Sequence, residues 1–291
     1  LCVKRARSQL AVEAKWEVAV ERNHFEAEFL RVVELEVPGL APALLAEDES
    51  QGFIVLPYLD PSEWQLWKPQ LLAGHVDSAV AEAVGTHLGK LARVTRDRPE
   101  LLQQFDTTGL FHALRLDPYI LECARRHPDL APALTALADA TAARRESLVH
   151  GDVSPKNILA GRSSSAVVLD AECAWYGDPA FDLAFVLNHL LLKSVHRPDA
   201  AADLWAAMQT LMEARAAADA PEHAEAVQRR ATALLPALLL ARVDGKSPVE
   251  YLVDPKKKDA IRAVAGRFLR DPPTDTYDIV SALIGDQDNE Q

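Results

Sequence analysis

Two short strand-forming segments interrupt an otherwise helical sequence, and they constrain the fold more than any other feature. Residues 148–182 read LVHGDVSPKNILAGRSSSAVVLDAECAWYGDPAFD. Asn157 to Ala160 and Ala166 to Leu169 can each form a strand, and the Gly and Ser residues between them favour a turn. The pattern therefore predicts a β-hairpin set between helical regions.

The predicted hairpin brings oxygen-bearing side chains together. If its loop has four residues, 162–165, Asn157 lies directly opposite Asp170, and such paired side chains are roughly 5 Å apart at Cβ. An amide oxygen and a carboxylate at that separation can share magnesium. Asp152 lies five residues before Asn157 in an irregular loop, so it can face the same space. Phosphoryl transfer needs this set, because magnesium neutralises phosphate charge and a carboxylate accepts the proton of the attacking hydroxyl.

The rest of the chain divides into a small mixed unit and a large helical one. The first 60 residues read as a strand, a helix from about Val20 to Val33, and a second strand that Pro57 should end. Three stretches are rich in Ala and Leu at helical spacing: residues 78–94, 118–145 and 179–268. We expect an α+β fold with residues 1–60 as a small α/β lobe and residues 61–291 as a larger, mainly helical lobe.

The motif HGDVSPKN, with Asp170 and DPAFDLA after it, resembles the aminoglycoside phosphotransferase and choline kinase superfamily. The catalytic loop of that superfamily reads HxDxxxxN. The resemblance implies a bilobal protein-kinase-like fold that transfers the γ-phosphoryl group of ATP to a hydroxyl of a small molecule. It makes Asp152 the catalytic base, and Asn157 and Asp170 the magnesium ligands. His150 and Asp182 would support the loop, Asp182 by accepting backbone hydrogen bonds.

The same resemblance assigns nucleotide-binding residues near the start of the chain. Lys4 matches the strand lysine that contacts the phosphates of the nucleotide, and Glu26 matches its partner on the helix. The segment LPYL would be the hinge between the lobes, with backbone groups near Leu56 and Tyr58 beside the adenine. Only three residues precede Lys4, so we expect a small lobe that is incomplete at its N-terminus and lacks the phosphate-covering loop of the family.

Several functions remain open at this stage. An acidic cleft would suit a cationic acceptor such as an aminoglycoside or an amino alcohol. The opening stretch with Lys4, Trp16 and Arg22 also resembles methylthioribose kinase, so a sugar acceptor is the main alternative, although Asn157 departs from the loop of that kinase. A non-catalytic kinase-like binding module is a further alternative. A protein kinase is disfavoured because no DFG or APE motif follows the loop where an activation segment would be expected.

Composition excludes other classes of partner. The formal net charge of −12 opposes binding to nucleic acid or anionic lipid, since both repel an acidic surface. No apolar run reaches the roughly 20 residues of a membrane span. The three cysteines include no CxxC pair, which argues against a zinc site or a disulfide framework and favours a reducing compartment. We therefore expect a cytoplasmic protein with neither nucleic-acid nor membrane partners.

Other residues that can carry chemistry receive structural interpretations. Trp64 and Trp67 follow the hinge and are expected to pack the junction of the lobes, with a cleft lining as the alternative. Residues 244–252 form either a corner between helices or a substrate contact, and we favour the corner. Five histidines lack the spacing of metal ligands and are expected at the surface or in helix packing: His24, His75, His87, His112 and His189.

Overall fold

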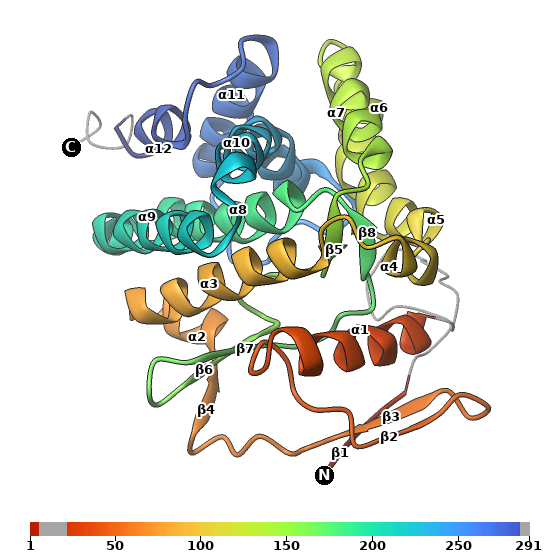
Figure 1. Ribbon diagram of the computed structural model, residues 1–291. Coiled ribbons are helices and arrows are strands. Elements are labelled where there is room, and N and C mark those ends of the chain that lie inside the picture. Colours follow the sequence, from red (N-terminus) through yellow and green to blue (C-terminus); the bar gives the residue numbers. More distant parts are fainter. Residues whose placement is uncertain (6–21, 286–291) are drawn as a thin grey trace.

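The structure, a computed structural model, describes residues 1–5 and 22–285 (Figure 1). The chain starts in a small antiparallel sheet with the strand order β1–β3–β2. Its strands are β1 (Cys2–Arg5), β2 (Ala46–Asp48) and β3 (Phe53–Leu56). The first strand pairs with the third from Cys2 opposite Leu56 to Arg5 opposite Phe53. The two strands that the sequence predicts here are therefore present, and β2 is an addition.

Helix α1 (Arg22–Glu36) lies between this sheet and the rest of the molecule. Leu30 packs with Ile54 of the sheet, whereas Phe29 and Val33 pack with residues of the large helical part. Apolar side chains three or four residues apart face both ways because a helix places them on neighbouring stripes. The predicted helix is confirmed from residue 22 onward. Its predicted start at Val20, like Trp16, lies outside the described residues.

The remaining described chain is mainly helical, which confirms the α+β class. The helices before the hairpin are α2 (Trp67–Leu72), α3 (Ser78–Thr95), α4 (Pro99–Gln104), α5 (Thr108–Phe111), the π-helical segment η1 (His112–Leu121), α6 (Glu122–Arg126) and α7 (Ala131–Ala143). Those after it are α8 (Ala180–His196), the 3-10 turn η2 (Pro198–Ala200), α9 (Ala201–Ala218), α10 (Pro221–Asp244), α11 (Pro255–Arg270) and α12 (Thr276–Ile284). Within the described residues, no helix is long and apolar enough to cross a membrane.

Helix α8 is the centre of the large core. Every residue from Ala180 to Val195 is buried, and α9 and α10 pack along it (Figure 1). Its sequence is apolar on all sides, as expected of a helix surrounded by other elements. The few polar side chains on such a helix therefore need a structural or functional explanation. Residues 244–252 link α10 to α11, so the predicted corner between helices is confirmed.

The predicted hairpin is present, but its register differs from the prediction. Strand β6 (Ile158–Gly161) pairs with β7 (Ala166–Val168), and β4 (Trp64–Leu66) adds to the other edge of β6. The amide of Gly161 donates to the carbonyl of Ser165 at 2.8 Å, so the loop has three residues, 162–164. Ser164 has φ +56°, the left-handed conformation that ends many three-residue hairpin loops.

This register changes which residue faces Asn157. Ile158 pairs with Val168, and the amide of Leu169 donates to the carbonyl of Asn157 at 2.7 Å. Asn157 is therefore opposite Leu169, and the prediction that it lies directly opposite Asp170 is wrong by one residue. Asp170 follows the ladder in a left-handed conformation with φ +70°, so its side chain no longer obeys the alternation of a strand.

Close packing of α3 against α9 generates a stability prediction. A Cβ atom at Gly85 would lie well inside van der Waals contact of the Leu211 carbonyl. We expect Gly85→Ala to destabilise the protein by about 1–3 kcal/mol, because overpacking forces the helices apart. Urea denaturation measures this change. Gly109→Ala is the matched control: a Cβ there meets nothing within 4 Å, so its stability should stay within about 1 kcal/mol of the wild type. Equal losses in both variants would contradict the close approach.

Candidate active site

The residues HGDVSPKN, here called the HGD loop (residues 150–157), are anchored to the core through α8. The loop leaves strand β5 (Ser147–Val149), which pairs with β8 (Trp175–Gly177). In the first turn of α8, Asp182 accepts the amide of His150 at 2.7 Å and the amide of Gly151 at 2.8 Å. These are the hydrogen bonds expected of Asp182. Burial raises the pKa of this carboxyl to about 7, and the two amides act against that rise.

His150 joins the loop to the end of the hairpin. Its Nδ1 accepts the amide of Asp152, and its Nε2 lies 3.1 Å from the carbonyl of Leu169. Because a carbonyl can only accept, Nε2 carries the proton and the ring is neutral. Burial lowers the pKa of His150 to about 4, which agrees with a neutral ring. The edge of this ring packs against Phe29 of α1, so α1 also contacts the loop.

Gly151 is required by both its backbone conformation and its neighbours. Its φ is +79°, and a Cβ atom there would collide with the carbonyl of Cys173. Any other residue would therefore be strained and would push the loop off the segment that follows Asp170. The carbonyl of Gly151 accepts a hydrogen bond from Arg115 Nε at 2.5 Å.

The carboxylate of Asp152 is held through one oxygen only. Three donors reach Oδ2: Arg115 Nη2 at 2.9 Å, Lys156 Nζ at 3.2 Å and Asn157 Nδ2 at 2.9 Å. Within the described residues Oδ1 has no hydrogen-bond partner, and it is not sealed from solvent. Burial alone would raise the pKa of Asp152, but Arg115 and Lys156 outweigh it and hold the pKa below its ordinary value. A charged carboxylate with one open oxygen can accept a proton.

Arg115 is a site residue that the sequence analysis missed. It belongs to the π-helical segment η1, is almost fully buried, and its guanidinium lies within 6 Å of the ring centres of Tyr119 and Phe185. The only available signal was Pro118, which has no amide to donate and so distorts a helix at that point. That signal indicates an irregular helix but does not identify Arg115.

Asn157 and Asp170 have different partners in the structure. The amide nitrogen of Asn157 donates to the carbonyl of Asp152 at 3.0 Å and to its Oδ2. Both are acceptors, so the NH2 group must face them and the amide oxygen faces away. That oxygen has no hydrogen-bond partner in the part of the chain that the structure describes. Asp170 instead forms an ion pair with Lys4.

Lys4 is the centre of a cluster of carboxylates. Its Nζ lies 2.6 Å from Glu26 Oε2 and 3.1 Å from Glu172 Oε1, in addition to the contact with Asp170. The structure therefore brings Lys4 and Glu26 together, as the family resemblance implied. Burial acts to lower the pKa of Lys4, but the three carboxylates outweigh it and raise the pKa. Lys4 is charged, and its position is defined by β1, α1 and the segment after β7.

The residues of the expected hinge lie at the C-terminal end of the central strand of the small sheet and just after it. Leu56 ends β3 opposite Cys2, and the side chain of Tyr58, two residues later, is 63% exposed. Trp67 is fully buried in the core of the large helical part, so it has a structural position but does not pack the junction of the lobes as expected. Trp64 packs on Gly161 through β4, so the segment after the hinge adds a strand to the hairpin.

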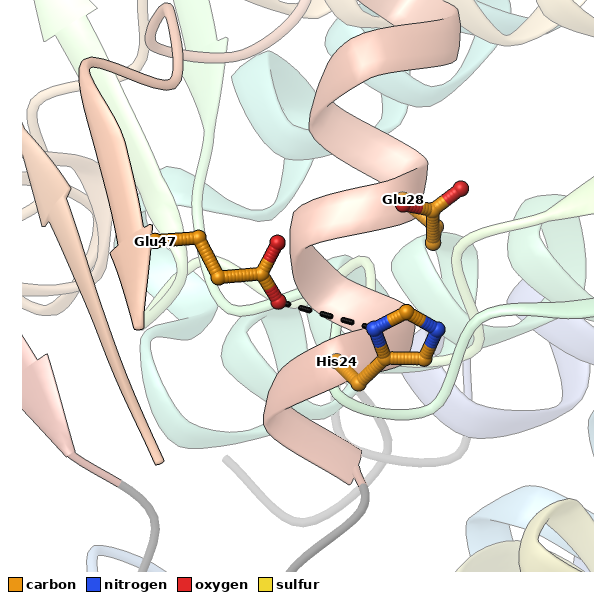
Figure 2. A group of neighbouring side chains, drawn as sticks. All are labelled: His24, Glu28 and Glu47. Atoms are coloured by element: carbon orange, nitrogen blue, oxygen red, sulfur yellow. Dashed lines mark ion pairs between the residues drawn. The ribbon is translucent and has the colours of Figure 1, made fainter. Parts of the chain in front are cut away.

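A second group of possible metal ligands lies on the opposite edge of α1. Figure 2 shows His24 turned toward Glu47 of β2, with Glu28 one helical turn further along. His24 Nδ1 is 3.5 Å from Glu47 Oε1. Spacing in the sequence could not reveal this group, because Glu47 comes from a distant strand. Arg31 forms ion pairs with both carboxylates and offsets part of their charge, so we assign no metal here.

The protonation of His150 generates a prediction about acid stability. The unfolded chain binds a proton on this ring below about pH 6.5, whereas the folded protein does so only near pH 4, because burial lowers the pKa of His150 to about 4. This group therefore contributes stability above pH 6.5, and up to about 3 kcal/mol is lost as the pH falls to 4. The raised pKa of Asp182 acts in the opposite direction, so a variant is needed to isolate the histidine.

We expect the stability advantage of the wild type over His150→Gln to shrink between pH 7 and pH 4.5. Urea unfolding at several pH values measures both free energies of unfolding. The variant keeps a polar side chain but has no group that titrates in this range. A difference that stays constant with pH would show that folding leaves the pKa of the ring at its unfolded value, and a difference that grows as the pH falls would show that the ring is charged in the folded protein.

The sequence of this chain is similar to those of known kinases. The chain is 26% identical over 211 residues to methylthioribose kinase from Yersinia pseudotuberculosis serotype O:1b (62% of this chain, 50% of the relative). It is 25% identical over 217 residues to methylthioribose kinase from Geobacillus thermodenitrificans (65% of this chain, 53% of the relative). The chain thus spans about half the length of the curated relatives it matches.

A solved structure shares the fold. A choline/ethanolamine kinase family protein from Mesorhizobium loti superposes with a TM-score of 0.52 at 16% identity and covers 98% of this chain and 92% of its own. The predicted kinase-like fold, with a small N-lobe and a helical C-lobe, is thereby confirmed. The profile of the phosphotransferase enzyme family matches residues 1–220. This match covers both the Lys4 cluster and the HGD loop, and the chain therefore belongs to the phosphotransferase enzyme family.

Proposed function

We propose that this chain carries the active site of an ATP-dependent phosphotransferase that transfers the γ-phosphoryl group to a hydroxyl of a small molecule. One observation carries the proposal: Asp152 is charged and held by three donors on Oδ2, while Oδ1 is open. A general base for an alcohol needs such a carboxylate. Membership of the phosphotransferase enzyme family supports the same activity.

In the proposed reaction Asp152 orients the acceptor hydroxyl and receives its proton on Oδ1. The hydroxyl oxygen forms a bond to the γ-phosphorus, and the bond between that phosphorus and the bridging oxygen of ADP breaks. Arg115 and Lys156 keep the carboxylate in place and charged. Much of the rate enhancement then comes from this positioning, because phosphoryl transfer needs little covalent help.

Lys4 and Glu26 are proposed to position the phosphates of ATP. A lysine held by a buried glutamate is aimed in one direction, and phosphate oxygens are ordinary partners for its ammonium group. The 2.6 Å contact between the two side chains supports this role. We place the adenine beside the backbone of Leu56 and Tyr58, at the division between residues 1–60 and 61–291.

The residues present fit a magnesium ion. Asn157 has an amide oxygen without a hydrogen-bond partner in the described chain, and Asp170 supplies a carboxylate close to Lys4. Magnesium prefers such oxygen ligands, so we propose Asn157 and Asp170 as its protein ligands. When bound, it would neutralise charge on the transferring phosphate. Asn157 lies just before strand β6 and Asp170 lies just after strand β7, so neither proposed ligand belongs to the paired part of the hairpin.

A sugar acceptor is the second candidate. The likeness to methylthioribose kinases over 211 residues favours it, although these relatives are about twice as long as the matched region. A panel of acceptors with magnesium and ATP would separate the possibilities, with release of ADP as the measurement. The panel should contain methylthioribose, aminoglycosides and amino alcohols. Nucleotide binding without transfer to any acceptor would favour a non-catalytic binding module.

Asp152→Asn should reduce kcat about 100- to 10,000-fold, because it removes the general base and keeps the shape of the side chain. ADP release in the presence of the best acceptor measures this. Nucleotide binding should persist, which shows that the variant is folded. Asp271→Asn, an exposed acid after α11, is the control and should retain full activity. Normal turnover by Asp152→Asn would remove this residue from the role of base.

Asn157→Ala should raise the magnesium concentration needed for half-maximal activity about tenfold or more, because an oxygen ligand is lost. Titration of magnesium at saturating ATP measures this. The same variant also removes one donor from Asp152, which alone would lower kcat without altering the magnesium requirement. A lower kcat with an unchanged magnesium requirement would therefore show that Asn157 only positions Asp152.

A further inference from the structure

Four of the nine residues that line a small cavity beside the HGD loop are lysine or arginine. The cavity measures about 20 Å³, room for about one water molecule. The charged residues that line it are Lys68 of α2, Lys156 of the HGD loop, Lys193 of α8, Arg242 of α10 and Glu250 of the α10–α11 connection. Four cations against one carboxylate give this cavity a positive potential, although the whole chain carries a net charge of −12.

Only part of this positive charge is neutralised. Glu250 forms an ion pair with Lys68, and Lys156 contacts Asp152. Within the described residues, neither Lys193 nor Arg242 forms an ion pair with a carboxylate. Lys193 and Arg242 therefore have no carboxylate of the described chain in direct contact, although Glu250 of the same lining acts on both from a greater distance.

Lys193 is buried in a way that costs stability. It is 1% exposed, donates to the carbonyl of His189 at 3.2 Å, and lies 5.4 Å above the ring of Tyr251. Burial, with smaller contributions from Lys68 and Arg242, lowers the pKa of Lys193 to about 7, and Glu250 acts against this shift. An uncompensated charge in the core is unfavourable. Its presence on the central helix therefore calls for a partner that binds there.

Unused hydrogen-bonding groups lie at the same place. Arg242 donates from Nη1 to the hydroxyls of Tyr119 and Ser247, both at 3.1 Å, but its Nε is buried without a partner in the described chain. The hydroxyl of Tyr251 is likewise buried and without a partner there. Buried polar atoms are nearly always paired in native proteins, so these donors indicate a missing acceptor.

The cavity and the proposed base share one loop. The amide of Lys68 donates to the carbonyl of Pro155 at 2.9 Å, which ties α2 to the HGD loop. Lys156 lines the cavity and also contacts Asp152 Oδ2 at 3.2 Å. A small molecule with its charged end in the cavity can therefore extend past Lys156 toward Asp152.

We infer that the acceptor in the proposed reaction is an anion: a small hydroxylated carboxylate or phosphate ester whose charged group binds Lys193 and Arg242 and whose hydroxyl faces Asp152. This inference rests on the proposed phosphotransferase function. It differs from the expectation of a cationic acceptor, which relied on the charge of the whole chain. The cavity is far too small for a whole sugar ring, so only the oxygen atoms of the charged group would enter it.

Matched three-carbon probes test the charge of the acceptor. D-glycerate is an anion, glycerol is neutral and serinol is a cation, and sn-glycerol 3-phosphate separates phosphate from carboxylate. The binding of each probe to the full chain is measured by calorimetry in the presence of magnesium and a non-hydrolysable ATP analogue. At least one anion should bind ten times more tightly than glycerol or serinol. Glycerol or serinol binding as tightly as the tighter of the two anions would overturn the inference.

Two variants connect the preference to the cavity. Lys193→Met and Arg242→Met should each weaken anion binding at least tenfold. Lys193→Met should also raise the melting temperature, because it removes a buried charge, whereas a purely structural lysine would lower it. Lys90→Met changes an exposed lysine of α3 and should alter neither quantity. Unchanged anion binding in both cavity variants would exclude the site.

Binding and turnover distinguish this inference from the proposed function. Anion binding that depends on Lys193, without transfer to any acceptor, would refute the phosphotransferase activity and leave the anion site standing. Transfer to glycerol or serinol, without anion binding, would refute the inference alone. Transfer to D-glycerate or sn-glycerol 3-phosphate, lost in Lys193→Met and retained in Lys90→Met, is the result we expect.

Discussion

The two hydrogen bonds from the HGD loop to Asp182 are the interaction on which the site depends. They connect an irregular loop to the first turn of the most deeply buried helix. Without that carboxylate, two buried amides would have no partner, and the loop would lose its defined shape. His150 and Arg115 then add a second layer, because each bonds to the loop and to a neighbouring element. The position of Asp152 is therefore set by hydrogen bonds between the HGD loop and buried side chains.

The charges of the site follow one rule. Asp152 is buried with two cations, and Lys4 is surrounded by three carboxylates, so each charge has the partners that burial requires. Lys193 departs from this rule, because its nearest polar contact is a carbonyl. Arg242 beside it also has no carboxylate in an ion pair among the described residues, so the pairing seen around Asp152 and Lys4 stops at this cavity. This contrast is the physical basis for assigning an anionic ligand to the cavity.

The sequence predicted local structure well and distant contacts poorly. Helices α1 and α3, the hairpin and the α10–α11 corner follow from spacing and turn residues, as periodicity and glycine or proline signals are local. The hairpin register was missed because Gly and Ser residues suit a loop of three or four residues equally, and nothing in the sequence marks Ser164 as left-handed. Arg115 and Lys193 were missed since their significance lies in contacts with distant elements. Strand β4 was too short to give a pattern.

Helix α8 carries the anchor of the HGD loop near its start and the buried lysine of the cavity near its end. Eleven residues separate Asp182 from Lys193, a rise of about 16 Å along the axis. One helix therefore carries two separate groups, the anchor of the HGD loop at its N-terminal end and the buried lysine at its C-terminal end. Under the proposed assignments, amino-acid changes near the C-terminal end would alter which compound binds, whereas the N-terminal end would keep the HGD loop in place. A scaffold of this kind lends itself to divergence in ligand choice with little loss of architecture.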